Sequence, residues 1–186
     1  LLTITNSNDA PVVVTPITDT STAEDTAFSH DTAASFADDD GIHGDSLTFS
    51  ATLSGGGALP AWLSIDPASG VLSGTPVNAD VGGLTIDVTA TDDAGANVTD
   101  SFLLTITNSN DAPVVVTPIA DTSTVEDAAF SHDTAASFTD DDGIHGDSLT
   151  FSATLSGGGA LPAWLSIDPA SGVLSGTPAN ADVGGL

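Results

Sequence analysis

Residues 46–53 read Ser46-Leu47-Thr48-Phe49-Ser50-Ala51-Thr52-Leu53, and polar and apolar side chains alternate at every position. A period of two is typical of a β-strand that has one face in a core and the other in solvent. The pattern therefore predicts a strand with its four apolar side chains buried. The same eight residues recur, unchanged, at 148–155.

Segments on both sides of this stretch carry further strand signals, separated by clusters of Gly, Pro, Asp and Asn that favour turns. In residues 84–91 the apolar side chains are again at alternate positions, and the last predicted strand buries Phe102, Leu104 and Ile106. The predicted strands are 11–17, broken at Pro16 and hence at a sheet edge, and 27–36, 46–53, 59–66, 71–74, 84–91 and 98–107. Short strands at this spacing predict an all-β fold, a seven-stranded sandwich of immunoglobulin type.

The chain is a tandem repeat with a shift of 102 residues. Residues 1–84 recur as 103–186 with five differences, so that 84 − 5 = 79 positions are identical. We interpret residues 1–8 as the last strand of a preceding repeat, 9–110 as a complete repeat and 111–186 as a second repeat without its last two strands. We expect that the natural chain continues; the alternative is that strands of a neighbouring chain complete the fold.

The composition excludes several classes of function. The chain has no Lys, Arg, Cys or Tyr, and 26 acidic residues give it a formal net charge of −26. Such a surface repels nucleic acid and anionic membranes, and no stretch is apolar for long enough to cross a bilayer. A reaction would have to rest on Asp and His alone, so we expect no enzyme. Disorder is disfavoured because 40% of the residues are hydrophobic and fall in regular alternation.

The acidic residues cluster where the sandwich is expected to turn, at Glu24-Asp25, Asp38-Asp39-Asp40, Asp92-Asp93 and the Asn8-Asp9 joint. Adjacent carboxylates without a cationic side chain repel one another unless a metal neutralises them. Oxygen ligands from Asp, Glu, Asn and backbone carbonyls suit calcium, whereas zinc prefers Cys and His. These clusters therefore predict Ca²⁺ as the cofactor. Asp19, Asp31, Asp66, Asp87 and Asp100 are interpreted as solvated turn residues instead.

Aromatic and imidazole side chains offer two other functions. Trp62 and Trp164 suggest a sugar-stacking platform, but their apolar neighbours favour a place in the core. His30 and His43, with their copies His132 and His145, suggest metal or acid–base chemistry. No nucleophile motif accompanies them, so we interpret them as surface or turn residues.

Several short motifs, in this order, resemble the cadherin-like repeats of dystroglycan type and the related immunoglobulin-like repeats of bacterial surface adhesins. They are Leu-Pro-Ala-Trp-Leu-Ser-Ile-Asp (59–66), Ser-Gly-Val-Leu-Ser-Gly-Thr-Pro (69–76), Ala-Asp-Val-Gly (79–82), Val-Thr-Ala-Thr-Asp (88–92) and Asn-Asp-Ala-Pro (110–113). The resemblance covers the whole chain. Asp80 matches an acidic position of the family, but the residues around it depart from the family's motif.

The resemblance implies calcium at the junction between consecutive domains. The implied ligands are Asn108, Asn110 and Asp111 of the linker, Glu24 of the preceding unit, and Asp140 and Asp142 of the following unit, with a carbonyl near Gly146. The matching set at the N-terminal joint is Asn6, Asn8, Asp9, Asp38, Asp40 and Asp92, and Glu126 is the copy of Glu24.

Near-identical units suit a spacer, in which every copy does the same work. The sequence therefore predicts a structural repeat, stiffened by calcium, of a long extracellular adhesin or biofilm matrix protein at a bacterial cell surface. The alternatives are a subunit of an extracellular filament or sheath, and a carbohydrate-binding module. The expected partners are calcium and neighbouring repeats, together with other copies or a surface polysaccharide in the two alternatives.

Overall fold

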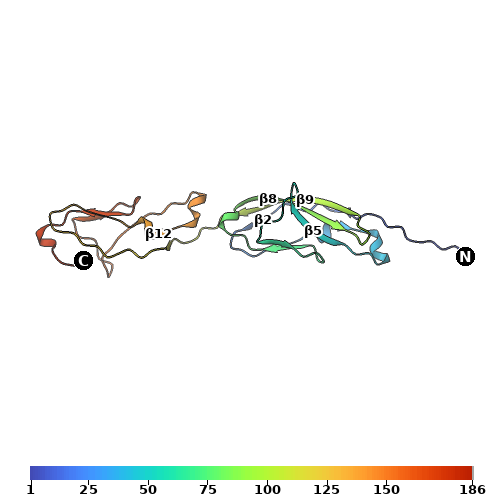
Figure 1. The fold of residues 1–186 in the computed structure, drawn as a ribbon, viewed down its shortest axis with the longest axis horizontal. Helices are drawn as coiled ribbons and strands as arrows, with labels where there is room; N and C mark the ends of the chain where they lie inside the picture. Colours follow the sequence, from blue (N-terminus) through green and yellow to red (C-terminus); the bar gives the residue numbers. More distant parts are fainter. Residues whose placement is uncertain (186) are drawn as a thin grey trace. The chain divides into compact units, whose positions relative to one another are not determined.

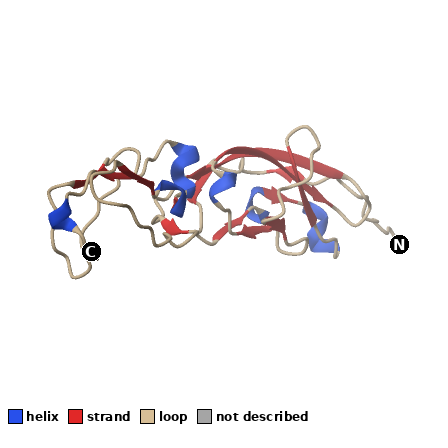
Figure 2. Ribbon diagram, turned by 60° about the vertical axis from the view of Figure 1, so that its left-hand side comes forward, coloured by secondary structure: helices blue, strands red, loops and turns tan. Residues whose placement is uncertain are grey.

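The computed structural model describes residues 1–185, and the chain divides into unit 1, Leu1–Ser109, and unit 2, which begins at Asn110. Each unit is built from β-strands joined by turns and by short 3-10 helices (Figures 1 and 2). The predicted all-β class is confirmed. No helix among the described residues is long and apolar enough to cross a membrane.

Unit 1 contains two main sheets and a short strand pair. The strands are β1 (Val12–Val13), β2 (Thr20–Ala23), β3 (Phe28–Asp31), β4 (Phe36–Ala37), β5 (Thr48–Leu53), β6 (Leu63–Ile65), β7 (Val71–Gly74), β8 (Gly82–Thr91) and β9 (Asn97–Thr107). One sheet has the order β2-β9-β8-β5, the other has the order β3-β7-β6, and β1 pairs with β4. All of these pairs are antiparallel except β2–β9, which is parallel.

The core of unit 1 lies between the two sheets. Leu72 of β7 belongs to one buried cluster with Ile86 and Val88 of β8 and Leu104 of β9. Phe49 belongs to the same cluster, and its flanking residues Thr48 and Ser50 are exposed. The alternation of the opening stretch therefore has the predicted orientation.

The first part of unit 1 differs from the prediction. Strand β1 covers only two residues of the predicted strand 11–17, and β2 follows it at Thr20–Ala23 as a strand that the sequence did not indicate. Pro16 lacks an N–H and interrupts the segment. After it, Asp100 accepts a hydrogen bond from the Ile17 N–H (2.7 Å) and Asp19 accepts one from the Leu103 N–H (2.8 Å), which hold the chain against β9. Asp19 and Asp100 therefore each bind a backbone N–H group that is distant in the sequence, and their interpretation as solvated turn residues is wrong.

The predicted strand 27–36 is also divided. The 3-10 helix η1 (Ala33–Ser35) separates β3 from β4, and each strand pairs in a different sheet. Thr32 is buried just before this helix, and its hydroxyl donates to the carbonyl oxygen of Gly70 at 2.7 Å. The chain thus crosses between sheets at a turn that side-chain alternation does not reveal.

Trp62 and His30 both take part in packing. Trp62 is partly buried against the core cluster, as expected. Its backbone passes close to Gly74: a Cβ atom added at position 74 would lie 1.8 Å from the carbonyl oxygen of Trp62, so only glycine fits there. His30 lies in β3, half-buried, with its ring 5.2 Å from that of Phe102. The interpretation of His30 as a surface or turn residue is therefore wrong, whereas His43 is exposed in the 3-10 helix η2 (Asp39–His43).

Unit 2 repeats only part of this architecture. Its strands are β10 (Val114–Val115), β11 (Phe130–Asp133), β12 (Phe138–Thr139), β13 (Leu165–Ile167) and β14 (Val173–Gly176). They pair as β10-β12 and β11-β14-β13, the same pairs as in the counterparts of unit 1. Within residues 110–185, no strand forms at the counterparts of β2 or β5, residues 122–125 and 150–155. An apolar cleft of about 290 Å³ lies beside Phe138, Phe151 and Leu174.

The N-terminal segment forms no strand either. Residues 1–11 lead into β1, and in Figure 1 their first part extends away from the sandwich of unit 1. Leu1, Leu2 and Ile4 are exposed.

Candidate metal centre

The acidic run 38–40 lies at the turn that follows β4. Asp38 caps η2, because its Oδ1 accepts a hydrogen bond from the Asp40 N–H at 2.9 Å. Gly44 ends this helix with a φ of 101°, a left-handed conformation that suits glycine. The Asp45 N–H then reaches back to the carbonyl oxygen of Asp40 at 3.3 Å. The turn therefore returns Asp45 to the carboxylates at its start.

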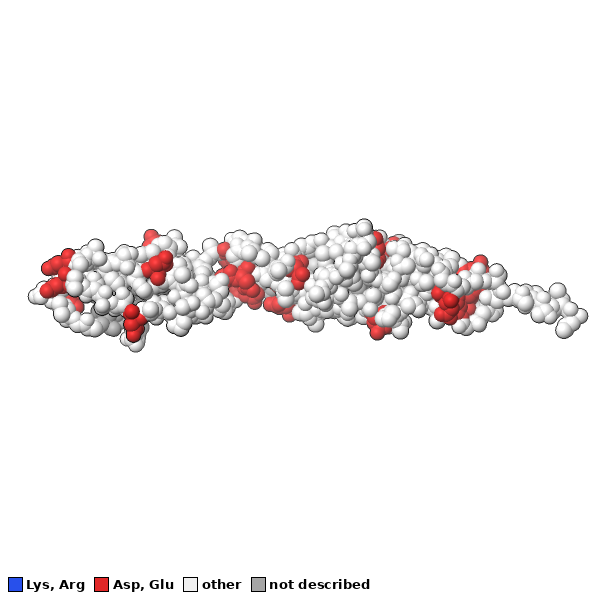
Figure 3. Space-filling view, in the orientation of Figure 1, with Lys and Arg blue, Asp and Glu red and all other residues white. Residues whose placement is uncertain are grey.

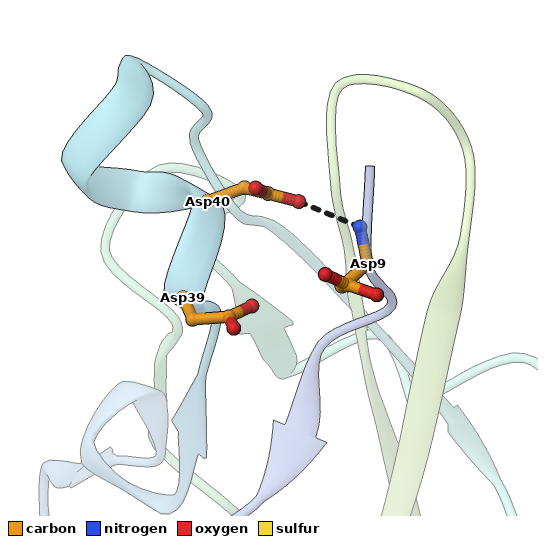
Figure 4. A group of neighbouring side chains, drawn as sticks. All are labelled: Asp9, Asp39 and Asp40. Carbon is orange, nitrogen blue, oxygen red and sulfur yellow. Dashed lines mark hydrogen bonds between the residues drawn. The ribbon is translucent and has the colours of Figure 1, made fainter. Parts of the chain in front are cut away.

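The joint residues 6–9 lie against this turn. The Asp9 N–H and the Asn6 Nδ2 each donate to one carboxylate oxygen of Asp40, both at 2.6 Å, and Asp9 and Asp39 lie beside it (Figure 4). Asp40 is only 4% exposed. The hydrogen bond from the Asp9 N–H, followed by that from Asn6, lowers the pKa of Asp40, so this carboxylate stays ionised in spite of its burial.

Asp92 joins the same end of unit 1 from the β8–β9 turn. Its Oδ2 accepts a hydrogen bond from Asn8 Nδ2 at 2.9 Å, and its Oδ1 accepts one from the Ala96 N–H at 2.8 Å. The bond from Asn8 is the largest cause of the lowered pKa of Asp92. A second buried carboxylate is therefore ionised here.

These residues form two carboxylate groups in unit 1. Oxygens of Asp9, Asp39 and Asp40 lie within 4.8 Å of one another, and so do oxygens of Asp38, Asp45 and Asp92. Figure 3 shows acidic side chains gathered at this end of the unit and no cationic side chain on the visible surface. The whole chain contains neither Lys nor Arg. Such a set of oxygen atoms can hold a hard divalent cation.

Glu24 lies at the other end of β9. It follows β2, its backbone N–H donates to the carbonyl oxygen of Thr107 at 3.0 Å, and its side chain is 1% exposed. Its Oε1 accepts a hydrogen bond from the Ser109 N–H at 3.0 Å, and its Oε2 is buried without a hydrogen-bond partner. Asp25, next to it, has a φ of 54°, a left-handed conformation uncommon for a residue other than glycine.

Unit 2 repeats the acidic turn of unit 1. The Asp111 N–H donates to Asp142 Oδ2 at 2.6 Å, and the Asp142 N–H donates to Asp140 Oδ1 at 3.1 Å. Asp142 is 1% exposed, and its Oδ1 is buried without a hydrogen-bond partner. Asp111, Asp141 and Asp142 form one carboxylate group, and Asp140, Asp142 and Asp147 form another.

The structure brings most of the predicted ligands together within each unit. Asn6, Asn8, Asp9, Asp38, Asp40 and Asp92 meet at one end of unit 1, and Asp111, Asp140 and Asp142 meet in unit 2. Glu24 meets the backbone of Ser109, and the exposed Asn110 donates through Nδ2 to the carbonyl oxygen of Asp111 at 2.9 Å. Asn108 and Glu126 are exposed, each in its own unit. Gly146 closes the helix η5 (Asp141–His145), and Asp80 Oδ2 accepts from the Val77 N–H.

Sequence reasoning missed Asp45 and Asp147, and it passed over the middle residues Asp39 and Asp141 of the two acidic runs. Asp45 follows Asp40 by five residues across a turn that ends in glycine, and that spacing is the signal that could have found it. The left-handed Gly44 turns the chain back after the 3-10 helix, so that the Asp45 N–H reaches the carbonyl oxygen of Asp40 at 3.3 Å. The same argument applies to Asp147.

Comparison with known proteins places both units in one fold. The model of the family described as "Putative Ig domain" matches residues 10–107 and 112–185. Among curated protein sequences, none matches this chain. The solved extracellular domain of protocadherin GammaB4 has a TM-score of 0.50 and 18% identity over 95% of this chain and 30% of its own, a likeness that shows the fold. The predicted immunoglobulin-like and cadherin-like resemblance is thus confirmed.

Two further structures are similar over most of the chain. An endo-fucoidan hydrolase of glycoside hydrolase family 107 has a TM-score of 0.43 and 26% identity, covering 97% of this chain. The titin domains z1z2, solved in complex with telethonin, have a TM-score of 0.44 and 12% identity over 91% of this chain and 81% of theirs. This chain spans about a quarter of the hydrolase, because the match covers 26% of that protein.

Proposed function

This chain belongs to the Putative Ig domain family, and from that premise we propose that it is a calcium-stiffened structural spacer of a long extracellular adhesin or biofilm matrix protein. Its two units are the repeating elements, and the joint between them is the element that calcium controls. We assign it no catalytic role.

One observation carries the proposal. Three buried carboxylate oxygens within residues 1–185 have no hydrogen-bond partner: Glu24 Oε2, Asp38 Oδ2 and Asp142 Oδ1. All three belong to residues that the sequence predicts as metal ligands. A buried carboxylate oxygen without a partner is costly, and no Lys or Arg exists to compensate it. A divalent cation supplies the missing positive charge.

The donor chemistry favours calcium. The candidate ligands are carboxylates, Asn amides and backbone carbonyls, and calcium accepts roughly six to eight such oxygens in flexible geometry. Magnesium requires a stricter octahedron, and zinc prefers nitrogen and sulfur ligands. The exposed His43 and His145 sit at the ends of the acidic turns, but neither belongs to a carboxylate group.

The linker at residues 108–111 is the segment that calcium binding would stiffen in this proposal. The four residues Asn108-Ser109-Asn110-Asp111 connect two buried acids along the chain, because the Ser109 N–H binds Glu24 and the Asp111 N–H binds Asp142. In the proposed mechanism, calcium binds within each unit, at the carboxylate that holds that unit's end of the linker. Calcium binds tightly only when the linker is fixed against these carboxylates. Calcium binding therefore stabilises the fixed linker, which stiffens the joint, and it stabilises both units.

The test is a calcium titration of the whole chain. Extracellular calcium modules bind at roughly 10⁻⁴–10⁻³ M, so millimolar calcium should raise the Tm and release or absorb heat in isothermal titration calorimetry. Small-angle X-ray scattering should show a larger maximum dimension in calcium than in chelator. The variant Asp142→Asn should lose most of the effect on shape.

The matched control is Asp168→Asn, which removes the same charge from unit 2. Asp168 caps an exposed turn through the Ala170 and Ser171 N–H groups, outside the carboxylate groups. This variant should respond to calcium as the unmodified chain does. A Tm and a scattering profile that are unchanged between chelator and 10 mM calcium would rule out the proposal, whereas an equal response to magnesium would assign the site to divalent cations in general.

A further inference from the structure

The turn that joins β6 to β7 contains an Asp–Pro peptide bond at an exposed position. Asp66, Pro67, Ala68 and Ser69 are exposed, whereas Gly70 at the end of the turn is buried. The nitrogen of the Asp–Pro bond belongs to a tertiary amide, because proline has no N–H. Such a nitrogen takes up a proton and leaves more easily than the nitrogen of an ordinary peptide bond. The Asp–Pro bond is therefore the bond of this turn that acid breaks most readily.

The fold holds the Asp66 carboxylate in its ionised form. Its Oδ1 accepts hydrogen bonds from the N–H groups of Ala68 (2.9 Å) and Ser69 (2.8 Å). The bond from the Ser69 N–H is the largest cause of a lowered pKa of Asp66, followed by the bonds from the Ser69 side chain and the Ala68 N–H. Strands β5, β6 and β7 carry no titratable side chain, and neither His30 nor Asp31 of β3 contributes to this shift. The carboxylate therefore stays charged below the pH at which an unfolded Asp takes up its proton.

The main-chain carbonyl group of Asp66 is polarised by the same turn. Its oxygen accepts a hydrogen bond from the Gly70 N–H at 2.9 Å. Gly70 has a φ of 68°, and a Cβ atom there would lie 3.2 Å from the backbone nitrogen of Ala33, so glycine suits this position. On the other side of the bond, the Pro67 carbonyl oxygen accepts a hydrogen bond from the Phe49 N–H at 2.9 Å. An N–H donor at a carbonyl oxygen stabilises the negative charge that develops there when a nucleophile attacks the carbon.

We propose that Asp66 cleaves its own peptide bond to Pro67 in acidic solution, with the side-chain carboxylate as the nucleophile. The Asp66 Oδ2 forms a bond to the main-chain carbonyl carbon of the same residue, which closes a cyclic anhydride. The bond from that carbon to the Pro67 nitrogen breaks, and the nitrogen leaves with a proton from the solvent. Water then opens the anhydride. The products are one piece that ends at Asp66 and one that begins at Pro67, and the reaction consumes only water.

Unit 2 repeats this arrangement at Asp168 and Pro169. The Asp168 Oδ1 accepts hydrogen bonds from the Ala170 and Ser171 N–H groups, both at 2.9 Å. Its carbonyl oxygen accepts one from the Gly172 N–H, also at 2.9 Å. The pKa of Asp168 is lowered as well, first by the bond from the Ser171 N–H. Both turns lie outside the carboxylate groups, so the cleavage is independent of the calcium proposal.

A cut at this turn leaves the strands on either side of it paired. Strand β6 pairs with β7 from Leu63 opposite Gly74 to Ile65 opposite Leu72. Strands β3 and β5, which precede the cut, pair with β7 and β8, which follow it. The cleaved unit therefore stays folded, and its two pieces are held together by non-covalent contacts alone. Acid thus converts a covalent connection into one that separates when the unit unfolds.

The test is the rate of cleavage of the whole chain in chelator, at about pH 3 and at about pH 4. The peptide Ser-Ile-Asp-Pro-Ala-Ser-Gly is the unfolded reference. Mass spectrometry of the denatured products should find the pieces 1–66, 67–168 and 169–186, and size-exclusion chromatography without denaturant should find them together. The folded chain should be cut severalfold faster than the peptide, and urea should reduce its rate to that of the peptide. A rate equal to or below that of the peptide would overturn the proposal.

Two variants separate the nucleophile from the leaving group. Asp66→Asn keeps an oxygen for the N–H groups of the turn but removes the charge, so the cut after residue 66 should stop. Pro67→Ala restores a secondary amide and should slow the same cut. In both variants the cut after Asp168 should continue, which makes unit 2 the matched internal control, and circular dichroism checks that the fold is kept. Undiminished cleavage after residue 66 in Asp66→Asn would show that this carboxylate is not the nucleophile.

Discussion

Residues 46–53 and 148–155 have identical sequences in different structures. In unit 1 the segment contains β5, which pairs with β8 over six register positions and buries Phe49. In unit 2 the same residues form no strand, and Phe151 is only partly buried. The sequence holds no copy of β9 beyond unit 2, and its copy of β8 reaches only Leu186. Alternation thus selects the face that a strand buries, but a partner is needed to make the strand.

The other sheet supports the same conclusion. Strands β11, β14 and β13 of unit 2 pair as β3, β7 and β6 do in unit 1, and all three partners lie inside unit 2. Each strand that unit 2 keeps has its partner present. Each segment that stays irregular, 122–125 and 150–155, is the copy of a strand that pairs only with β9 or β8. The comparison of the two units therefore distinguishes the local preference of a segment for β-structure from its pairing with a neighbouring strand, and the pairing decides whether the strand forms.

Supplying the partners should produce the largest change. If a copy of residues 85–107 is appended after Leu186, residues 122–125 and 150–155 should become strands, because β8 and β9 counterparts are then present. Far-UV circular dichroism should gain β-structure, and amide hydrogen exchange should slow in both segments. A matched extension with Asp at the copies of Ile86, Val88, Phe102 and Leu104 should change neither measurement. If the polar extension works equally well, pairing does not decide the difference.

A smaller effect should separate the two copies of one phenylalanine. Phe49→Ala should destabilise unit 1 by about 3–5 kcal/mol, as large-to-small changes in a packed core do. Phe151→Ala should cost unit 2 clearly less, because its ring is less buried in the open cleft. Urea unfolding can be followed through Trp62 in a Trp164→Phe background, and through Trp164 in a Trp62→Phe background. Equal losses in the two units would show that the cleft is as well packed as the core.

The smallest effect concerns pH and His30. Burial lowers the pKa of His30, and the nearby Asp31 only partly opposes this. An unfolded His titrates near pH 6.5, so below about that pH the unfolded chain binds a proton that folded unit 1 excludes. The stability of unit 1 should be complete above this range and fall as the pH drops from about 7 towards 5.

His30→Leu should remove this pH dependence of unit 1. His132→Leu serves as the matched control in the other unit, where the sequence supplies no copy of Phe102 for the ring to contact. Urea unfolding at pH 7 and pH 5 measures both. The hypothesis fails if unit 1 of the His30→Leu variant keeps the full dependence on pH.

Much of the fold was predictable where alternation and the turn residues agree. Strands β5, β7, β8 and β9 lie within or close to their predicted ranges, and the inward faces of β8 and β9 are as expected. The division of residues 27–36 was not predictable, since it depends on the bond from Thr32 to Gly70, 38 residues away. Strand β2 is polar, and it is a strand because β9 lies beside it.

The candidate site shows a similar limit. The acidic runs and the joint residues are visible in the sequence, and the resemblance implied that Asp9 and Asp40, and likewise Asp111 and Asp142, would lie close together, as they do. Asp45 was missed because its approach depends on the left-handed Gly44. The burial of Glu24 could not be predicted either, because it depends on the ends of β2 and β9 lying together. There the Glu24 N–H donates a hydrogen bond to the carbonyl oxygen of Thr107.

The parallel pairing of β2 and β9 has a consequence for force. Tension along a chain of such units enters before β2 and leaves after β9, at opposite ends of the pair. The strands are then pulled past one another, and the load is shared by all four register pairs from Thr20–Leu104 to Ala23–Thr107. An antiparallel hairpin pulled from its open end would instead separate one pair at a time. Under tension the pairing of β2 with β9 in unit 1 is thus loaded in shear, the direction in which all four pairs must break together.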